Sequence, residues 1–126
     1  GLGVYGLNEI LNYLKNNVVD TIIVTDSIDL YRIESKCSKC KNIQEDIVER
    51  IKVIQTKTEL KNTPCSSCKS LGVIVLEQDI VDYISLLGAK TGTNVEVISG
   101  VAEHGIMVSN IGKIGAILRY NPNYTN

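Results

Sequence analysis

The chain has 126 residues, a formal net charge of −1 and 44% hydrophobic residues, and its aromatic side chains are six tyrosines, with no Phe and no Trp. This length fits one domain with an aliphatic core, and the small net charge argues against a protein that binds nucleic acid along its whole surface. No apolar run approaches the roughly 18 residues of a membrane span, and the first residues do not follow a signal-peptide pattern. We therefore expect a soluble, cytoplasmic chain with no membrane partner.

The first 35 residues predict a helix followed by two strands. Apolar residues recur three and four positions apart between Leu7 and Leu14, which predicts a helix over residues 6–17. A nearly continuous apolar run predicts a buried strand over residues 18–25. A second, more polar strand is expected over residues 30–35.

The second half of the chain alternates strands with helices. Gly88 is expected to end the first of these helices, and the polar tail of the chain is expected to be loose. Such an alternation predicts a layered α/β sandwich with a mainly parallel sheet. The expected elements are strands over residues 71–76, 94–98 and 114–119 and helices over residues 79–87 and 101–111, with the tail at 121–126.

The four cysteines form two pairs, Cys37-Ser-Lys-Cys40 and Cys65-Ser-Ser-Cys68, separated by 24 residues. Two such turns supply the four thiolates of a closed tetrahedral zinc site, and a zinc ion with four protein ligands is structural because it has no open position. Lysines at 36, 39, 41 and 69 favour the thiolate form. Two disulfides or a redox-active pair are the alternatives, and a cytoplasmic setting disfavours the disulfides.

The segment between the two cysteine pairs is ambiguous in sequence. Isoleucines from Ile43 to Ile54 fit a helix, whereas residues 51–57 also fit a strand. Residues 36–69 carry eight basic and four acidic residues, a balance of +4, and the rest of the chain sums to −5. We expect residues 37–68 to form a zinc-binding mini-domain inserted into a sandwich made of residues 1–36 and 69–126.

The end of the chain carries the most specific motif. Gly112-Lys-Ile-Gly-Ala-Ile-Leu-Arg-Tyr120 is similar to the GGIGAILRY ending of the C-terminal domain of class-1 peptide chain release factors. Tyr5-Gly6-Leu7-Asn8-Glu9 and the NVEVIS segment at 94–99 resemble the opening and a late strand of that domain. Archaeal members often carry two CxxC pairs as an insert at this place, so the chain resembles the archaeal branch over residues 4–120.

The chain departs from the family pattern at four positions. The family usually has Gly, an aromatic residue, Phe and Gly where this chain has His104, Met107, Ile111 and Lys113. These departures point toward a divergent member. The ribosome-rescue protein Pelota has a related C-terminal domain and is one alternative. A kink-turn RNA-binding module of similar fold is another, although the balance of −5 outside the cysteine segment argues against a basic binding face there.

The resemblance implies a role in translation termination. Family members recognise stop codons with an N-terminal domain and release the peptide with a Gly-Gly-Gln loop of a middle domain. This chain has neither that loop nor a catalytic set around its single histidine, so we expect no enzymatic activity and no small-molecule substrate. The resemblance implies that the domain binds the translational GTPase that delivers the factor, which is elongation factor 1 alpha in archaea, and reaches the ribosome through the full-length protein. We expect the GTPase-binding face to comprise Tyr5, Leu7, Met107 and Ile111, because apolar and aromatic anchors dominate interface energies.

Overall fold

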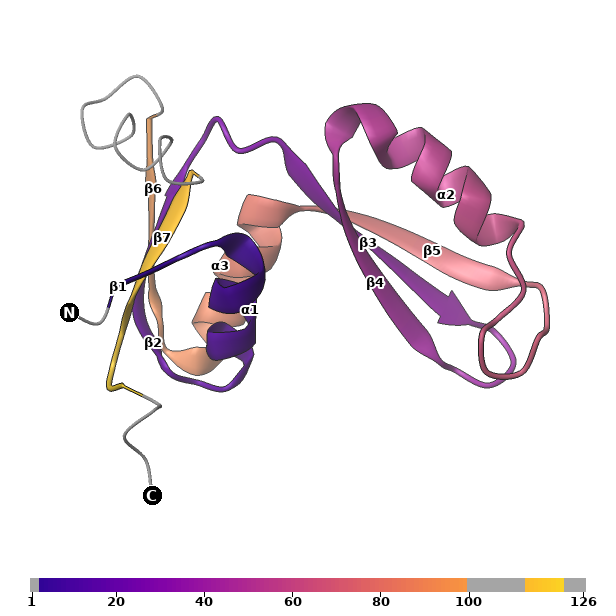
Figure 1. The fold of residues 1–126 in the computed structure, drawn as a ribbon, viewed down its shortest axis with the longest axis horizontal. Coiled ribbons are helices and arrows are strands. Elements are labelled where there is room, and N and C mark those ends of the chain that lie inside the picture. The colour runs from indigo at the N-terminus through magenta and orange to yellow at the C-terminus, as the bar shows by residue number, and fades with distance from the viewer. Residues whose placement is uncertain (1–2, 100–112, 122–126) are drawn as a thin grey trace. The chain divides into compact units, whose positions relative to one another are not determined.

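The computed structural model describes residues 3–99 and 113–121, and the chain divides into two compact units (Figure 1). Unit 1 comprises residues 1–28 and 81–126, and unit 2 comprises residues 29–80. Each unit has its own β-sheet. Among the described residues, no helix is long and apolar enough to cross a membrane.

Unit 1 contains a four-stranded sheet in the order β1-β7-β2-β6. Its inner strands, β7 and β2, pair antiparallel, as do β1 and β7, whereas β2 and β6 pair parallel. Two helices lie on the same side of this sheet (Figure 1). The elements are β1 (Gly3–Tyr5), α1 (Leu7–Lys15), β2 (Val19–Thr25), α3 (Ile80–Thr91), β6 (Asn94–Ile98) and β7 (Ile114–Leu118).

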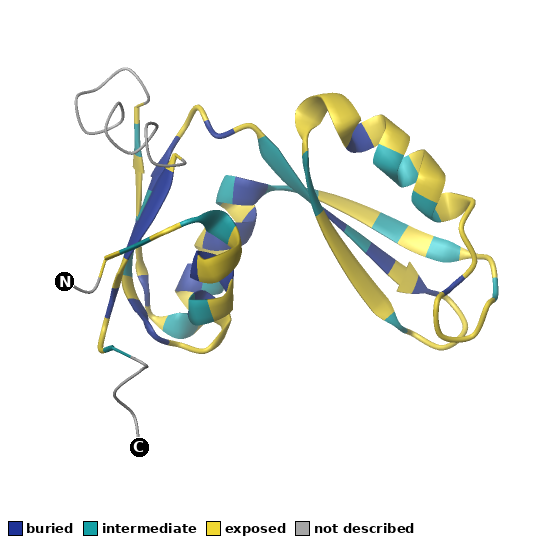
Figure 2. Cartoon of the chain, viewed as in Figure 1, coloured by how far each residue is buried: buried dark blue, intermediate teal, exposed yellow. Residues whose placement is uncertain are grey.

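The core of unit 1 is aliphatic, as the composition predicts. The predicted face of α1 is buried, and β2 contributes alternate buried residues and β7 nearly continuous ones (Figure 2). Because these faces meet away from water, they supply most of the favourable free energy of folding for this unit. The fully buried residues include Ile10, Leu14, Ile22, Ile84 and Ile114.

Two glycines of unit 1 mark close approaches. Gly115 lies opposite Tyr5 in the β1–β7 register, and a Cβ there would lie 3.2 Å from a ring carbon of Tyr5, so the tyrosine ring covers the glycine. A Cβ at Gly88 would lie 2.6 Å from Val95. Gly88 therefore lets α3 approach β6 closely and does not end the helix, which continues to Thr91; the prediction of a stop at Gly88 is wrong.

Unit 2 is a three-stranded antiparallel sheet in the order β4-β3-β5, with α2 packed on one face. Alternate residues of the central strand, Ile33, Ser35 and Cys37, are buried, which is the period-two pattern of a sheet covered on one side. The elements are β3 (Leu30–Cys37), β4 (Ile43–Glu49), the 3₁₀ turn η1 (Arg50–Lys52), α2 (Val53–Lys61) and β5 (Val73–Asp79).

The opposite face of the unit 2 sheet is uncovered by any described element of this unit, and we call it the open face. The strand registers place on it the residues that alternate with the buried ones. Apolar side chains on the outer strands flank charged side chains on the central strand, where Arg32 is paired with Glu34 and Glu45. The open face comprises Arg32, Glu34, Lys36, Ile43, Glu45, Ile47, Ile74, Leu76 and Gln78.

The prediction of a mainly parallel sheet is wrong. Among the strands that the structure describes, only β2 and β6 pair parallel, and all other pairs are antiparallel. The alternation of strands and helices misled because β3 and β5 belong to a separate sheet. In addition, β7 returns between β1 and β2 and pairs antiparallel with both.

The second unit is wider than the insert expected from the cysteines alone. Its boundaries lie at 29 and 80 rather than 37 and 68, because the strands that carry the cysteine loops belong to its sheet. The segment between the two cysteine pairs, which fitted either a helix or a strand, contains one of each. The strand β4 comes first and the helix α2 second, the reverse of the order in which the two patterns occur in the sequence. The predicted helix over residues 101–111 and most of the predicted loose tail lie outside the described residues.

Candidate metal centre

The four cysteines come together at one end of the unit 2 sheet. Cys37 ends β3 and Cys40 lies in the β3–β4 turn, while Cys65 and Cys68 lie in the loop between α2 and β5. All four Sγ atoms lie within 4.8 Å of one another. Cys37 and Cys65 are buried and the other two are exposed, so the cluster closes the sheet's end and reaches the surface.

The sulfur separations fit a metal site better than disulfides. Sγ of Cys37 lies 3.6 Å from Sγ of Cys68, and Sγ of Cys40 lies 3.5 Å from Sγ of Cys65. A disulfide requires about 2.05 Å. A tetrahedral zinc ion with Zn–S bonds of about 2.3 Å separates its sulfurs by roughly 3.8 Å. The two closest sulfur pairs are therefore near the spacing of a tetrahedral thiolate site and far from that of a disulfide.

The two cysteine loops have the same backbone structure, and we call them knuckle 1 (residues 37–42) and knuckle 2 (residues 65–70). The first cysteine N–H donates to the carbonyl five residues on, at 2.9 Å in both knuckles. The N–H after the second cysteine returns to the carbonyl of the first, at 3.0 Å and 2.9 Å. This matching pattern points both thiols of each knuckle toward one shared position.

Hydrogen bonds make the four thiols unequal acids. The side chain and backbone N–H of Ser70 lower the pKa of Cys68 to about 6, and the backbone N–H groups of Cys68 and Ser67 lower that of Cys65. At Cys40 the N–H of Asn42 lowers the pKa, but hydrogen bonds with neighbouring thiols and burial outweigh it and raise the value to about 11. Four thiols this close cannot all ionise unless a cation joins them, and the four cysteines form a group that could hold a metal ion.

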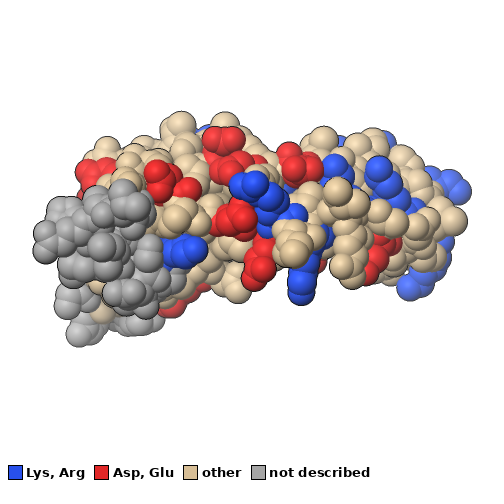
Figure 3. All heavy atoms as spheres, turned by 90° about the horizontal axis from the view of Figure 1, so that it is seen from above, with Lys and Arg blue, Asp and Glu red and all other residues tan. Residues whose placement is uncertain are grey.

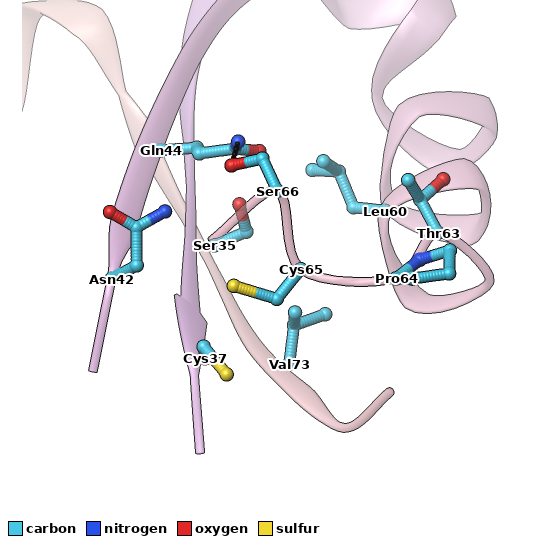
Figure 4. A pocket seen from close by; sticks show the side chains of 10 residues that line it. All are labelled: Ser35, Cys37, Asn42, Gln44, Leu60, Thr63, Pro64, Cys65, Ser66 and Val73. Carbon is cyan, nitrogen blue, oxygen red and sulfur yellow. Dashed lines mark hydrogen bonds between the residues drawn. The ribbon is translucent and has the colours of Figure 1, made fainter. Parts of the chain in front are cut away.

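A small cavity of about 20 Å³ lies beside the cysteine cluster (Figure 4). In this view the sulfurs of Cys37 and Cys65 lie near each other below a hydrogen bond of 2.9 Å from Gln44 Nε2 to Ser66 Oγ. A cavity of this size holds about one water molecule. This small cavity therefore has no room for an organic ligand.

The structure brings together only part of the predicted GTPase-binding face. Tyr5 is 57% exposed and lies in the short strand β1 rather than in the helix, and Leu7 is half-buried at the start of α1. Met107 and Ile111 lie outside the described residues. Sequence reasoning also missed the donors Asn42 and Ser70, although their shared position, two residues after the second cysteine of each pair, was a readable signal.

Comparison with known proteins agrees with this architecture. The family model described as eRF1 domain 3 matches residues 1–122. The chain is 36% identical over 121 residues to peptide chain release factor subunit 1 of Methanocaldococcus jannaschii, covering 95% of this chain and 29% of that protein. It is 28% identical to the protein of the same name from Pyrococcus abyssi, again covering 29% of its length.

A solved structure is similar as well. It is the C-terminal domain of the peptide chain release factor from Methanosarcina mazei, with a TM-score of 0.78 and 27% sequence identity over 97% of this chain and 73% of that one. The chain therefore spans less than a third of the curated relatives it matches and most of a release factor C-terminal domain. On these matches, the chain belongs to the eRF1 domain 3 family, and it resembles the C-terminal domain of archaeal release factors.

Proposed function

We propose that the chain is the C-terminal domain of a cytoplasmic translation termination factor that directs release of the nascent peptide at stop codons. The observation that carries this proposal is the match of residues 1–122 to the eRF1 domain 3 model. The domain itself acts as a binding module without catalysis. Peptide release belongs to parts of the full-length factor that this chain does not contain.

In unit 2, we propose that Cys37, Cys40, Cys65 and Cys68 bind one structural zinc ion. Support comes from the sulfur separations of 3.5 Å and 3.6 Å and from the matching backbone of the two knuckles. Four soft thiolates in a tetrahedron are the donor set that zinc prefers. The ion would tie the β3–β4 turn to the α2–β5 loop.

In unit 1, the proposed partner is the translational GTPase that delivers the factor, elongation factor 1 alpha in archaea. Tyr5 is the described residue best suited as an anchor, because an exposed tyrosine offers a large contact area at a small cost in side-chain entropy. Leu7 adds apolar surface beside it. Met107 and Ile111 complete the proposed face, because the family resemblance and their apolar side chains indicate them as anchors.

Calorimetric titration of the chain with this GTPase tests the proposal. Replacing Tyr5 and Met107 with Ala should weaken binding by on the order of 1–3 kcal/mol in total. Tyr120→Ala is the matched control, since Tyr120 is 47% exposed and lies beyond the other end of β7. Because the Tyr5 ring covers Gly115, a modest loss of thermal stability should accompany the double variant. Equal binding by the parent and the double variant would exclude this face.

We propose that the domain reaches the ribosome as part of the full-length factor. The charge of unit 2 supports such a contact only near the cysteines. The balance of +4 over residues 36–69 falls to +1 over the whole of unit 2, which has nine basic and eight acidic residues. Figure 3 shows basic side chains over unit 2 on the visible face, interspersed with acidic ones. A phosphate contact would thus be confined to the lysine-bearing knuckles, and raising the salt concentration should weaken it.

A further inference from the structure

Each knuckle ends in a lysine that folds back onto its own loop. Lys41 and Lys69 directly follow the second cysteine of their pairs. The Nζ of Lys41 donates to the carbonyl of Ser38 at 3.0 Å, and the Nζ of Lys69 donates to the carbonyl of Ser66 at 3.2 Å. Two loops of different sequence therefore place an ammonium group at the same point relative to their cysteines.

Both lysines also adopt a backbone conformation that is unfavourable for them. Their φ angles are 65° and 64°, in the left-handed region where glycine is the residue without a steric cost. Glycine would satisfy the turn equally well. The strain at two equivalent positions is therefore a reason to look for a function of the side chain.

The charge of the proposed site supplies that function. A zinc ion with four thiolates carries a net charge of −2, and two ammonium groups anchored on the knuckles bring the total to zero. The hydrogen bonds to Ser38 and Ser66 hold each lysine over its own loop, which carries two of the four cysteines. Groups outside the ligand set orient ligands and tune metal affinity in this way.

We propose that Lys41 and Lys69 form a matched pair of outer residues that neutralise the four-thiolate metal site and strengthen its hold on the ion. The inference rests on the proposed zinc site and goes beyond it, because it assigns a role to two residues that are not ligands. It also gives the left-handed backbone at both positions a physical reason.

Knuckle 1 provides a matched control. Lys39 lies within the same CxxC pair and is exposed, but its φ is not positive. The equivalent residue of knuckle 2 is Ser67, so this lysine has no counterpart there. Replacing Lys39 changes the net charge of the chain as much as replacing Lys41 does. A difference between the two variants therefore reports on position rather than on total charge.

The test is zinc affinity, measured by competition with a chromogenic chelator on the whole 126-residue chain. The double variant Lys41→Gln/Lys69→Gln should bind zinc roughly tenfold more weakly than the parent, and the loss should shrink in high salt. Lys41→Arg/Lys69→Arg should stay close to the parent, and Lys39→Gln should change affinity less than twofold. The visible absorption of the cobalt-substituted protein reports whether the tetrahedral thiolate site persists in each variant.

Parental affinity in the glutamine double variant would overturn the inference, as would equal losses of affinity in the charge-matched single variants Lys39→Gln and Lys41→Gln. A double variant of Lys41→Gly and Lys69→Gly separates charge from backbone strain. It should lose as much affinity as the glutamine variant, and parental affinity there would also overturn the inference. A parent chain that binds no zinc would remove the metal site itself, a result distinct from a parent that binds zinc and variants that bind it equally well.

Discussion

The two units bury apolar side chains to very different extents. Among the residues that the structure describes, unit 1 contains 13 of the 18 buried hydrophobic ones, whereas unit 2 contains Ile33, Cys37, Val53, Cys65 and Ile80. Two of those five are proposed metal ligands. Of the 11 large hydrophobic residues that are exposed in the described ranges 3–99 and 113–121, six belong to unit 2. Small domains with little buried apolar surface usually need a cross-link such as a metal ion, so we expect the proposed zinc ion to stabilise unit 2 as the packed core stabilises unit 1.

Removing the metal is expected to have the largest effect, and the effect should be confined to unit 2. Cys65→Ser, or a strong chelator, should unfold unit 2, because the binding free energy of a structural zinc site, about 10–16 kcal/mol, contributes directly to folding. Amide hydrogen exchange should show loss of protection in β3, β4 and β5. Protection in β2 and β7 should remain, since their core lies in unit 1.

A single cooperative transition of the whole chain would contradict this picture. It would mean that unit 2 is required for the stability of unit 1. Ser66→Ala is a suitable control, because it removes the hydrogen bond from Gln44 without removing a ligand, and it should leave protection in both units nearly unchanged.

Acid should release the metal from unit 2. Metal binding requires thiolates, so protons compete with the ion, and affinity must rise with pH. In the metal-free cluster the pKa of Cys68 is lowered to about 6, so Cys68 is already ionised at neutral pH. The pKa of Cys40 is raised to about 11, so Cys40 must lose its proton when the metal binds. Affinity should therefore rise between pH 6 and 11 and fall more steeply below pH 6, where Cys68 is protonated as well.

Proton release can be counted by calorimetry in buffers of different ionisation enthalpy. Binding near pH 7.5 should release at least the proton of Cys40. Zinc binding that releases no protons would contradict the assignment of thiol ligands. Unit 1 carries none of these thiols, and its hydrogen-exchange protection should not follow the same pH profile.

In unit 1, a single arginine ties the sheet to a helix end. The guanidinium of Arg119 donates to the carbonyls of Val19 at 3.0 Å, Thr91 at 2.8 Å and Gly92 at 3.1 Å, so it holds the end of α3 against the start of β2. Charge-assisted hydrogen bonds to backbone carbonyls contribute about 1.5–3 kcal/mol. Arg119→Ala should therefore lower the unfolding free energy of unit 1 by about 2–3 kcal/mol, as measured by urea denaturation.

Arg50→Ala is the matched control in unit 2. Arg50 pairs with Asp29 at 3.1 Å, but its side chain is 71% exposed, and exposed ion pairs contribute little. We expect this substitution to leave the unfolding free energy almost unchanged. Unchanged zinc affinity in Arg119→Ala would further separate the two units, whereas a weaker affinity would show that they are coupled.

The smallest effect on stability is expected at Lys113, a lysine of unit 1 whose backbone is in the left-handed region. Its φ is 65°, and its Nζ donates to the carbonyl of Ser27 at 3.3 Å. Lys113→Gly relieves the backbone and loses that exposed hydrogen bond, so the unfolding free energy of unit 1 should stay equal or rise by at most about 1 kcal/mol. A clear loss of stability would show that the side chain contributes more here than the backbone costs.

The sequence predicted the local elements of the chain better than their pairing. The apolar spacing of α1, the apolar run of β2 and the strand over Asn94–Ile98 were readable because each pattern is local. Strand β1 was missed because three residues show no period. The order β1-β7-β2-β6 depends on contacts between distant segments that the alternation of strands and helices does not encode.

The candidate site was predictable in its ligands but not in its surroundings. Two CxxC pairs indicate that four sulfurs meet, since each pair is a local turn. The sequence indicated that Lys41 and Lys69 are basic neighbours of the cysteines, as Lys36 and Lys39 are. It did not indicate the left-handed backbone that sets Lys41 and Lys69 apart, because only Gly or Asn signals that conformation. The extent of unit 2 was underestimated because the cysteines mark the knuckles and not the strands that carry them.

The open face of unit 2 has a consequence for the behaviour of concentrated protein. Exposed apolar rows on the outer strands, such as Ile43 on β4 and Ile74 on β5, are the kind of surface that stacks against another sheet and drives aggregation. The central strand interrupts those rows with Arg32, Glu34 and Lys36. A second molecule stacked on this face would have to remove water from the exposed ammonium of Lys36, so we expect this lysine to oppose self-association.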